Sequence, residues 1–289
     1  MSREPRIFMF SPLMQQHLQK AADAHKYTHG HAVIVTGGAG RTGAARLAGR
    51  GALRIGAGLV TLVVPDDAVA EVSSQITAIM MSPLGGIGDL DGLLRDPRLS
   101  ALCVGPGLGL EPRQADIVAA VLARARPTVL DADALTLIAN SSRLRQSLHP
   151  TCILTPHEGE FARLFPDLAD DLPDQSRISA RAQVLRSAAA RVGCTVLLKG
   201  PATLVADHTG QAWVHPSSPD GGLSWLATAG SGDVLAGFCV GLLARGLSPM
   251  LAANLAIHLH RSAARQFGPG LIAEDLPEVL PALFRDMGL

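Results

Sequence analysis

Short apolar runs alternate along this chain with longer segments in which small and charged residues interrupt the apolar ones. The runs that stand out are residues 31–36, 59–64, 101–104, 128–130, 152–154 and 195–198. Continuous apolar runs of this length are typical of strands buried on both faces of a sheet. The segments near 42–56, 113–125 and 176–191 carry the spacing of helices. This alternation predicts an α/β fold with a mostly parallel central sheet and helices on both of its faces.

The remaining segments complete this pattern. Residues 1–28 are interpreted as a polar helical lead-in, and the Gly- and Asp-rich residues 84–92 as a loop. Two further strands, 203–206 and 211–214, are separated by a turn and predict a hairpin. From Ser231 onward the pattern predicts three helical pieces, broken near Pro249 and at 268–270. Since no linker interrupts the alternation, we expect a single domain over residues 1–289.

Composition narrows the class of protein. The 289 residues are 47% hydrophobic and only 3% aromatic, so the core is expected to be aliphatic. The formal net charge is zero, which argues against nucleic acid or an anionic membrane as a partner. The longest apolar run, 235–244, is half the roughly 20 residues of a membrane span, and the start lacks a signal-type core. The four cysteines lie far apart in apolar segments, which indicates buried free thiols and a cytoplasmic protein.

The first chemistry-bearing stretch is Gly230-Ser231-Gly232-Asp233, which opens a helical pattern. A glycine-rich loop at a helix N-terminus offers free backbone N–H groups to an anion. A carboxylate beside such an anion hole would repel a phosphate, unless Asp233 serves as a general base while the hole holds the transferred charge. The alternative is that Asp233 only complements the helix dipole.

Other strand ends carry polar groups as well, and in doubly wound folds ligands bind beyond these ends. Lys199, at the end of 195–198, suggests a nucleotide site or an ordinary turn with a solvated lysine. His157, after 152–154, suggests a substrate contact or a structural turn residue. Asp131 and Asp133 could orient a magnesium ion through water, or cap a helix. Together these strand ends indicate an enzyme.

The segment Gly38-Ala39-Gly40-Arg41-Thr42-Gly43 matches the dinucleotide fingerprint, and Asp66 follows at about the expected spacing of roughly 20 residues. We interpret this match with caution, because Asp66 comes after Pro65 rather than at the strand tip. A dehydrogenase would also leave residues 199–237 without a role.

The motifs together resemble those of the NAD(P)H-hydrate dehydratases, the ADP/ATP-dependent repair enzymes of the ribokinase-like superfamily. The matching stretches are Tyr27-Thr28-His29-Gly30, Thr42-Gly43-Ala44-Ala45, Gly56-Ala57-Gly58-Leu59-Val60-Thr61, Gly105-Pro106-Gly107-Leu108-Gly109, Asp131-Ala132-Asp133-Ala134-Leu135, Thr155-Pro156-His157-Glu158-Gly159-Glu160, Leu198-Lys199-Gly200 with Thr203, and Ala227-Thr228-Ala229-Gly230-Ser231-Gly232-Asp233-Val234-Leu235. They follow the family's order from residue 27 to about residue 260. The fingerprint at Gly38 then belongs to a protein that binds a nicotinamide nucleotide as substrate, not as redox cofactor.

The resemblance implies a ribokinase-like three-layer α/β/α sandwich and a lyase reaction. Hydrated NADH or NADPH (NADHX, NADPHX) would be phosphorylated on its hydroxyl by ADP or ATP, with Mg²⁺, and loss of phosphate would restore the double bond. It also implies an oligomer, by family a homotetramer, and a separate epimerase in the same pathway. The metal ligands stay open, with Asp131 and Glu160 as candidates.

The resemblance also implies roles for individual residues. Asp233 would be the base, with Gly230, Ser231 and Gly232 as the anion hole. The residues expected to contact the hydrate are Ala44, Gly107, His157 and Asp233. Those expected to contact the nucleotide are Lys199, Gly200, Pro201, Ala202, Thr203 and Gly232.

Three departures from the family pattern concern the nucleotide side. Ser231 stands where Thr is usual, Pro201 removes one N–H, and the segment 217–225 is longer than the usual turn. Two other functions stay open. A ribokinase-like kinase of a small alcohol or vitamin precursor could use the same aspartate, although Ala227 lies where such kinases usually carry Asp. A non-catalytic nucleotide sensor would not need Asp233.

Overall fold

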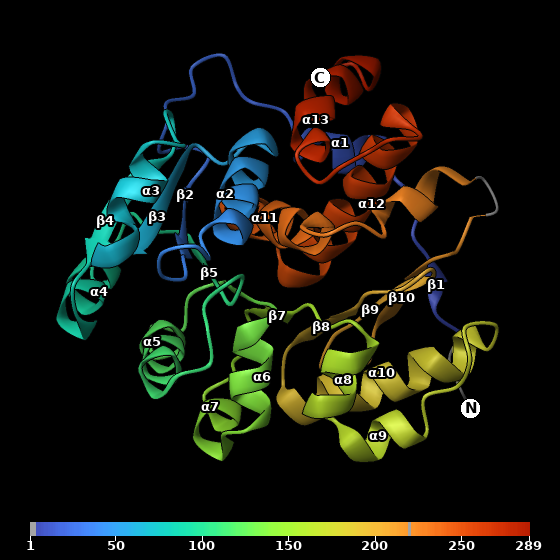
Figure 1. Ribbon diagram of the computed structural model, residues 1–289. Coiled ribbons are helices and arrows are strands. Elements are labelled where there is room, and N and C mark those ends of the chain that lie inside the picture. The colour runs from blue at the N-terminus through green and yellow to red at the C-terminus, as the bar shows by residue number, and fades with distance from the viewer. Residues whose placement is uncertain (1–3, 219–220) are drawn as a thin grey trace.

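A single ten-stranded sheet runs through the computed structural model, which describes residues 4–218 and 221–289 (Figure 1). The strand order is β1-β10-β9-β8-β7-β6-β5-β2-β3-β4. The strands from β8 through β4 in this order are all parallel, and β9 pairs antiparallel with both β8 and β10. Helices cover both faces, so the predicted α/β/α sandwich of ribokinase-like type is confirmed.

The described strands have the following bounds. They are β1 (Arg6–Ile7), β2 (His31–Val35), β3 (Leu59–Pro65), β4 (Met80–Leu84), β5 (Ala101–Val104), β6 (Thr128–Leu130), β7 (Cys152–Leu154), β8 (Thr195–Leu198), β9 (Thr203–Ala206) and β10 (Ala212–His215). All six predicted core strands and the predicted β9–β10 hairpin are present at these positions. The six apolar runs could be predicted because they lie inside the sheet, where both faces are buried.

The helices divide between the two faces of the sheet. They are α1 (Pro12–Gln16), α2 (Gly43–Arg54), α3 (Val69–Ser73), α4 (Ile87–Leu94), α5 (Pro112–Leu122), α6 (Asp133–Ala139), α7 (Ser142–Gln146), α8 (Glu158–Leu164), α9 (Pro166–Asp170), α10 (Ile178–Val192), α11 (Ser231–Ala244), α12 (Pro249–Phe267) and α13 (Asp275–Asp286), with short 3₁₀ turns η1 (Asp66–Ala68) and η2 (Gly221–Leu226). One hydrophobic cluster packs α2 and α11–α13 on one face, and a second packs α4–α8 and α10 on the other. None of the described helices is long and apolar enough to cross a membrane.

The predicted helical lead-in is wrong for most of its described length. Only α1 is helical there, and β1 adds to the sheet edge beside β10. Phe8 and Phe10 alternate with exposed residues and stack on His215 and His258, with ring centroids 4.8 Å apart in each case. That spacing of two is the period of a strand, and it is the signal that the helical interpretation overlooked.

The predicted loop at 84–92 is also wrong, because α4 occupies most of it. Leu90 and Leu94 lie four residues apart and are both buried, while the Asp89 carboxylate accepts the Gly86 N–H at 2.9 Å. Gly86 and Asp89 therefore form the N-terminal cap of α4. The helical pattern is weak because Leu90 and Leu94 are its buried residues. Strand β4 was not predicted, since Pro83 interrupts its pattern, but it lies at the sheet edge, where a missing N–H is tolerated.

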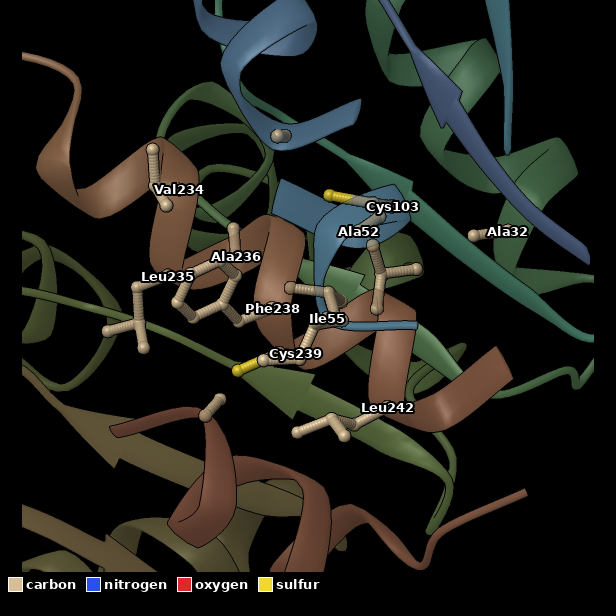
Figure 2. Close-up of a cluster of buried hydrophobic side chains, with 14 of the residues drawn as sticks. Ala32, Ala52, Ile55, Cys103, Val234, Leu235, Ala236, Phe238, Cys239 and Leu242 are labelled. Atoms are coloured by element: carbon tan, nitrogen blue, oxygen red, sulfur yellow. The ribbon is translucent and has the colours of Figure 1, made fainter. Parts of the chain in front are cut away.

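Helix α11 is held against α2 by close backbone packing. A Cβ atom added at Gly237 would lie 2.2 Å from the Ala48 carbonyl oxygen, and one at Gly241 would lie 2.3 Å from Ile55. Figure 2 shows the cluster around these helices, with Ala52, Ile55 and Phe238 among its labelled side chains. Small residues let the two helices approach closely, and this contact fixes the N-terminus of α11 near the strand ends.

Candidate active site

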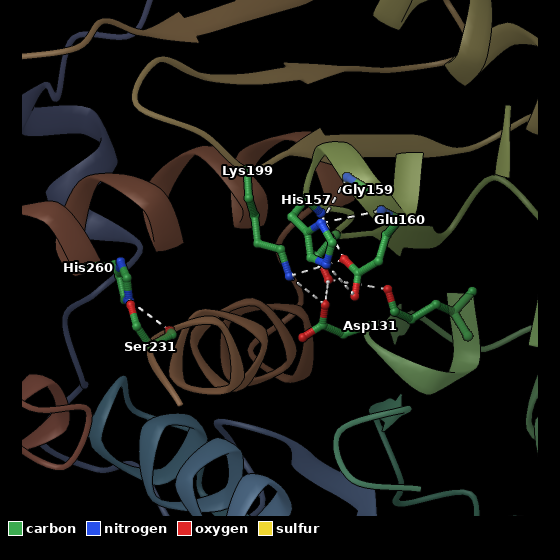
Figure 3. Close-up of polar contacts among 9 residues, drawn as sticks. Asp131, His157, Gly159, Glu160, Lys199, Ser231 and His260 are labelled. Carbon is green, nitrogen blue, oxygen red and sulfur yellow. Dashed lines mark hydrogen bonds and ion pairs between the residues drawn. The ribbon is translucent and has the colours of Figure 1, made fainter. Parts of the chain in front are cut away.

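The predicted polar residues meet where β5, β6, β7 and β8 end, because these four strands are neighbours in the sheet. Their following loops carry Gly107, Asp131, His157 and Lys199 in turn. The N-terminal half of α11 packs against β5 and β6 and brings Asp233 to the same edge. Figure 3 shows the resulting group of Asp131, His157, Glu160 and Lys199 beside α11.

Lys199 forms the centre of this polar group. Its Nζ donates to Asp131 Oδ1 at 2.9 Å and lies 3.7 Å from Glu160 Oε2. Burial by itself lowers the pKa of Lys199, but the charges of Asp131 and Glu160 outweigh burial, so its pKa is raised. The lysine is therefore a charged group held in place rather than the solvated lysine of an ordinary turn.

Both carboxylates that contact Lys199 are fixed by further hydrogen bonds. The side chain of Asp131 is only 2% exposed, and its Oδ1 also accepts from Thr155 Oγ1 at 2.8 Å. Glu160 Oε2 accepts the His157 backbone N–H at 2.8 Å. These contacts leave the lysine ammonium little freedom to move away from the strand ends.

His157 caps α8 and still faces outward. Its Nδ1 accepts the backbone N–H groups of Gly159 and Glu160 at 3.0 and 3.3 Å. Nδ1 is thus an acceptor, so Nε2 carries the proton in the neutral ring. Nε2 lies 3.5 Å from Glu160 Oε1, and the side chain is 54% exposed. The structural and the substrate-contact interpretations of His157 are therefore compatible, since the ring can cap the helix and face a ligand.

Asp133 is the first residue of α6 and does not cap that helix through its side chain. Its Oδ2 accepts the Gly109 N–H at 2.8 Å and thereby joins the loops after β5 and β6. Ala132, between the two aspartates, has a φ of 46°, a conformation that a non-glycine residue rarely adopts. This backbone turns Asp131 toward Lys199 and Asp133 toward Gly109.

Asp233 lies in the first turn of α11, after Gly230 with a φ of 84°. Burial and the charges of Asp131 and Glu160 raise its pKa to about 6, although Lys199 opposes the shift. The helix N-terminus by itself would lower the pKa of Asp233, whereas this pKa is raised. Complementing the helix dipole therefore does not account for the surroundings of Asp233. A carboxylate with such a pKa is suited to accept a proton near neutral pH.

The loop before Asp233 is held by His260, which the sequence analysis did not single out as a functional residue. His260 Nε2 lies 2.9 Å from the Ser231 carbonyl oxygen and 3.3 Å from its hydroxyl (Figure 3). Burial lowers the pKa of His260 to about 4, so the ring is neutral and acts as a fixed hydrogen-bond partner. His258, two residues earlier on α12, stacks on Phe10 instead.

A cavity of about 510 Å³ lies between this loop and the turn after β8. Its lining includes the predicted nucleotide residues Lys199, Gly200, Pro201, Thr203 and Gly232, together with Ser231. A Cβ added at Gly232 would lie 3.5 Å from Lys199 Nζ, so the anion-hole loop and the lysine share one wall. We call this space the donor cavity.

Three further observations concern the edge of the donor cavity. Ala202 is buried beneath the turn rather than in the cavity wall. Arg261, which sequence reasoning missed, donates to the Pro201 carbonyl oxygen at 3.3 Å and thus supports the turn that lacks one N–H. Of the longer segment 217–225, Ser217, Ser218 and Leu223 line the cavity, and residues 219–220 fall outside the described part of the chain.

Ala44 and Gly107, the other predicted substrate contacts, form a pair. Gly107 has a φ of 66°, and a Cβ added there would lie 2.5 Å from the Arg41 carbonyl oxygen and 3.6 Å from the Ala44 Cβ. The loop after β5 thus lies against the N-terminus of α2. This loop also lies against the Asp131 loop, because a Cβ added at Gly105 would lie 1.8 Å from the Asp131 carbonyl oxygen and Gly109 N–H donates to Asp133.

Several donors of the fingerprint loop at 38–43 are bound by acidic side chains of the chain itself. Gly40 N–H donates to Glu71 Oε2 at 2.6 Å, Ala39 N–H donates to Asp67 Oδ2 at 3.3 Å, and the Thr42 hydroxyl donates to Glu71. The bonds from Gly40 and Thr42 lower the pKa of Glu71, which keeps this carboxylate charged. Asp67 and Glu71 therefore occupy N–H groups that a dinucleotide cofactor site would leave to the phosphates of its ligand.

Comparisons with known proteins agree with this geometry. The sequence model of a family described as NAD(P)H-hydrate dehydratase matches residues 32–280. A bifunctional NAD(P)H-hydrate repair enzyme of Moorella thermoacetica is 38% identical over 283 residues, which are 93% of this chain and 52% of that protein. Another from Mycobacterium tuberculosis is 37% identical over 77% of this chain and 42% of that protein. The chain spans about half the length of the curated relatives it matches.

Solved structures show the same fold. An ADP/ATP-dependent NAD(P)H-hydrate dehydratase from Bacillus subtilis, co-crystallized with ATP/Mg²⁺, superposes with a TM-score of 0.79 at 28% identity. The superposition covers 97% of this chain and 98% of that one. A hydroxyethylthiazole kinase from Pyrococcus horikoshii has a TM-score of 0.64 at 14% identity over 93% of each chain, a likeness of fold alone.

Proposed function

The chain belongs to the NAD(P)H-hydrate dehydratase family, and from this premise we propose that it converts hydrated NADH or NADPH back to the reduced nucleotide. ADP or ATP would donate its terminal phosphoryl group to the ring hydroxyl of the hydrate. Loss of that phosphate from one ring carbon and of a proton from the next would restore the double bond. With ATP the products are NADH or NADPH, ADP, phosphate and a proton.

One observation carries the proposal: Asp233, with a pKa of about 6, lies between the anion-hole loop and the Lys199 cluster at the strand ends. In the proposed mechanism Asp233 accepts the hydroxyl proton of the hydrate. The N–H groups at the start of α11 and the Lys199 ammonium stabilise the negative charge of the transferred phosphoryl group. This division of roles needs one base and one anion-binding loop, which Asp233 and the loop before it are proposed to supply.

The nucleotide is proposed to bind in the donor cavity, because its wall combines Lys199 and Gly232 with apolar side chains such as Leu235 and Ile257. The hydrate is proposed to lie on the other side of Asp233, toward Ala44, Gly107 and His157. The name of the Bacillus subtilis structure, which was co-crystallized with ATP/Mg²⁺, supports ATP as a donor.

The donor set fits Mg²⁺ only as an ion held mainly by phosphates and water. Among the described residues no group of three or more His, Cys, Asp or Glu side chains could hold a metal. Asp131 Oδ1 already accepts from Lys199 and Thr155, so Asp131 and Glu160 are proposed to face the ion through water. When bound, Mg²⁺ would neutralise phosphate charge.

The kinase alternative finds no support of its own in the structure. The likeness to the thiazole kinase is one of fold, while the family match is to the dehydratases. We further propose a cytoplasmic homotetramer that works with a hydrate epimerase. The four free cysteines and the bifunctional names of the relatives support this proposal.

The test is recovery of reduced nicotinamide absorbance from NADHX and NADPHX with Mg²⁺ and either ADP or ATP. We expect nucleotide-dependent recovery that Asp233→Asn abolishes while calorimetry still detects nucleotide binding. Asp66→Asn, at an exposed carboxylate, is the control and should stay active. Absence of recovery with either nucleotide from the folded protein would refute the proposal.

A further inference from the structure

Three segments that are far apart in the sequence form the walls of the donor cavity. They are the turn after β8 with Pro201, the stretch after β10 with Ser217, and the loop at the start of α11 with Gly232. Helix α12 adds His260 and Arg261 to the same lining. The shape of the cavity therefore depends on the contacts that hold these segments against one another.

Arg261 connects two of these walls. Its Nη1 donates to the carbonyl oxygens of Pro201 at 3.3 Å and of His215 at 3.4 Å. Its Nη2 donates to the carbonyl oxygen of Pro216. The planar guanidinium reaches acceptors in several directions at once, whereas a lysine places all its donors on a single atom. One side chain, only 8% exposed, thus holds the turn after β8 against the end of β10.

The third wall is held by the residue just before Arg261. His260 Nε2 lies 2.9 Å from the carbonyl oxygen of Ser231, in the loop at the start of α11 (Figure 3). Burial and then the charge of Arg261 lower the pKa of His260 to about 4, so His260 stays neutral beside its charged neighbour. Two consecutive residues of α12 therefore fix all three walls.

The turn after β8 depends on Arg261 because of Pro201. Proline has no backbone N–H, so the main chain of Pro201 can bond to other segments only through its carbonyl oxygen, which accepts from Arg261. Within the turn, Thr203 Oγ1 donates to the Gly200 carbonyl oxygen at 3.0 Å, which ties the turn to β9 but not to the other walls. Loss of the guanidinium would therefore release the Pro201 side of the turn from the end of β10.

The end of β10 has supports of its own. The His215 ring stacks on Phe8 with centroids 4.8 Å apart, and its Nε2 lies 3.0 Å from Asn254 Oδ1. His215 and Asn254 are both buried. The turn after β8, rather than the end of β10, is therefore the part whose position depends on Arg261.

We propose that Arg261 is a positioning residue of the donor site, which fixes the turn of Gly200 and Pro201 so that the cavity is formed before the nucleotide binds. This inference rests on the proposed function. The Nη1 and Nη2 groups bond to the cavity wall itself, so Arg261 acts on the nucleotide through the turn and takes no part in the chemistry. A site formed in advance binds more tightly, because less ordering accompanies binding. Arg261 should therefore set nucleotide affinity and leave the hydrate site and the chemical step unchanged.

The probe is adenylyl imidodiphosphate, a non-hydrolysable ATP analogue, and its binding with Mg²⁺ is measured by calorimetry beside steady-state kinetics. In Arg261→Gln the dissociation constant of the analogue and the KM for ATP should rise by about tenfold, the effect of losing a charge-assisted hydrogen bond. The KM for the hydrate and the kcat at saturating ATP should stay within about twofold of the wild type. A role in folding alone would not separate the two KM values in this way.

Arg261→Lys keeps the charge but cannot span the carbonyl oxygens of two segments. It should bind the analogue almost as weakly as Arg261→Gln, and it decides the question by itself if Arg261→Gln does not fold. Wild-type affinity in Arg261→Lys would show that charge alone matters and would overturn the positioning role. A fall in kcat at saturating ATP as large as the rise in KM would overturn it as well.

The matched control is Arg191→Gln, at an exposed ion pair with Asp167. It removes the same charge from the outer helix α10 and should leave the affinity for the analogue unchanged. Failure of this inference and failure of the proposed function are distinguishable. Binding of the analogue that depends on Arg261, without turnover of NADHX, would refute the dehydratase proposal and keep the positioning role. Turnover of NADHX with unchanged affinity for the analogue in both Arg261 variants would do the reverse.

Discussion

At the scale of single residues, the site places three carboxylates around one cation. Asp131, Glu160 and Asp233 all interact with Lys199, and Asp131 and Glu160 are the two that it contacts directly. Lys199 cannot neutralise all three, so the remaining carboxylate, Asp233, carries the raised pKa. Burial and the neighbouring carboxylates thus raise the pKa of the proposed base without any ligand.

The first prediction concerns the stability of Asp233→Asn. The pKa of Asp233 is about 6 in the folded protein and near its ordinary 3.8 in the unfolded chain. The folded state therefore binds the proton more tightly between about pH 4 and pH 6, and its stability declines as the pH rises through this window. Above it, Asp233→Asn should be more stable than the wild type by about 1–3 kcal/mol, since the asparagine carries no buried charge. Urea unfolding at a series of pH values measures this.

The control for this prediction is again Asp66→Asn, a substitution of an exposed carboxylate, which should not reproduce the stabilisation expected for Asp233→Asn. A stability difference for Asp233→Asn that does not change between pH 4 and pH 7 would show that the pKa of Asp233 is not raised in the folded protein.

Most of the site's polar residues could be predicted from the sequence because each follows a strand, and strand ends meet at one edge of a parallel sheet. Asp131, His157 and Lys199 are of this kind, whereas Asp233 was predicted from the glycine-rich loop that begins α11. His260 could not be predicted as the partner of Ser231, because its contact depends on how α12 crosses α11.

At the scale of secondary-structure elements, the contact between α2 and α11 positions both sides of the site. Helix α11 carries Asp233 and α2 carries Ala44, so a shift of one helix against the other changes the distance between the proposed base and the proposed hydrate contact. The sequence predicted both helices but not their closeness, because Gly237 and Gly241 acquire meaning only opposite Ala48 and Ile55. Edge elements such as β1 and β4 were missed because only part of their surface is buried.

Gly237→Ala tests this contact. The new Cβ would lie 2.2 Å from the Ala48 carbonyl oxygen and 2.7 Å from its Cα, so one backbone must move. We expect a loss of about 3 kcal/mol in the free energy of unfolding, at the upper end of overpacking effects. The KM for the hydrate should rise more than the KM for ATP, since α2 borders the hydrate side.

The matched control is Gly92→Ala in α4, where an added Cβ meets nothing within 4 Å. It should stabilise the protein slightly, by about 0.5–1 kcal/mol, because alanine is the better helix former. Equal effects of the two substitutions would show that the α2–α11 contact is not tight.

At the scale of the whole molecule, one sheet separates two hydrophobic clusters while the site draws on both. Lys199, Asp131 and Glu160 come from strand ends and from α8, and Asp233 comes from α11 on the opposite face. The reacting groups keep their geometry only if both layers stay packed on the sheet. The two layers are therefore expected to unfold together, as a single domain would.

The four cysteines can test this cooperativity directly. Cys103 and Cys239 belong to the cluster with α11, and Cys152 and Cys194 belong to the other. All four thiols are buried and free. Burial raises the pKa of Cys152 to about 12 and also raises the pKa of each of the other three thiols. None of them is therefore expected to react while the protein is folded. We expect all four to become reactive with the same opening free energy, equal to that of global unfolding. Thiol labelling across a denaturant series, read at each cysteine by mass spectrometry, measures it beside circular dichroism. Earlier labelling of one pair would mean that its layer opens alone, and that the site loses its base or its lysine before the sheet unfolds.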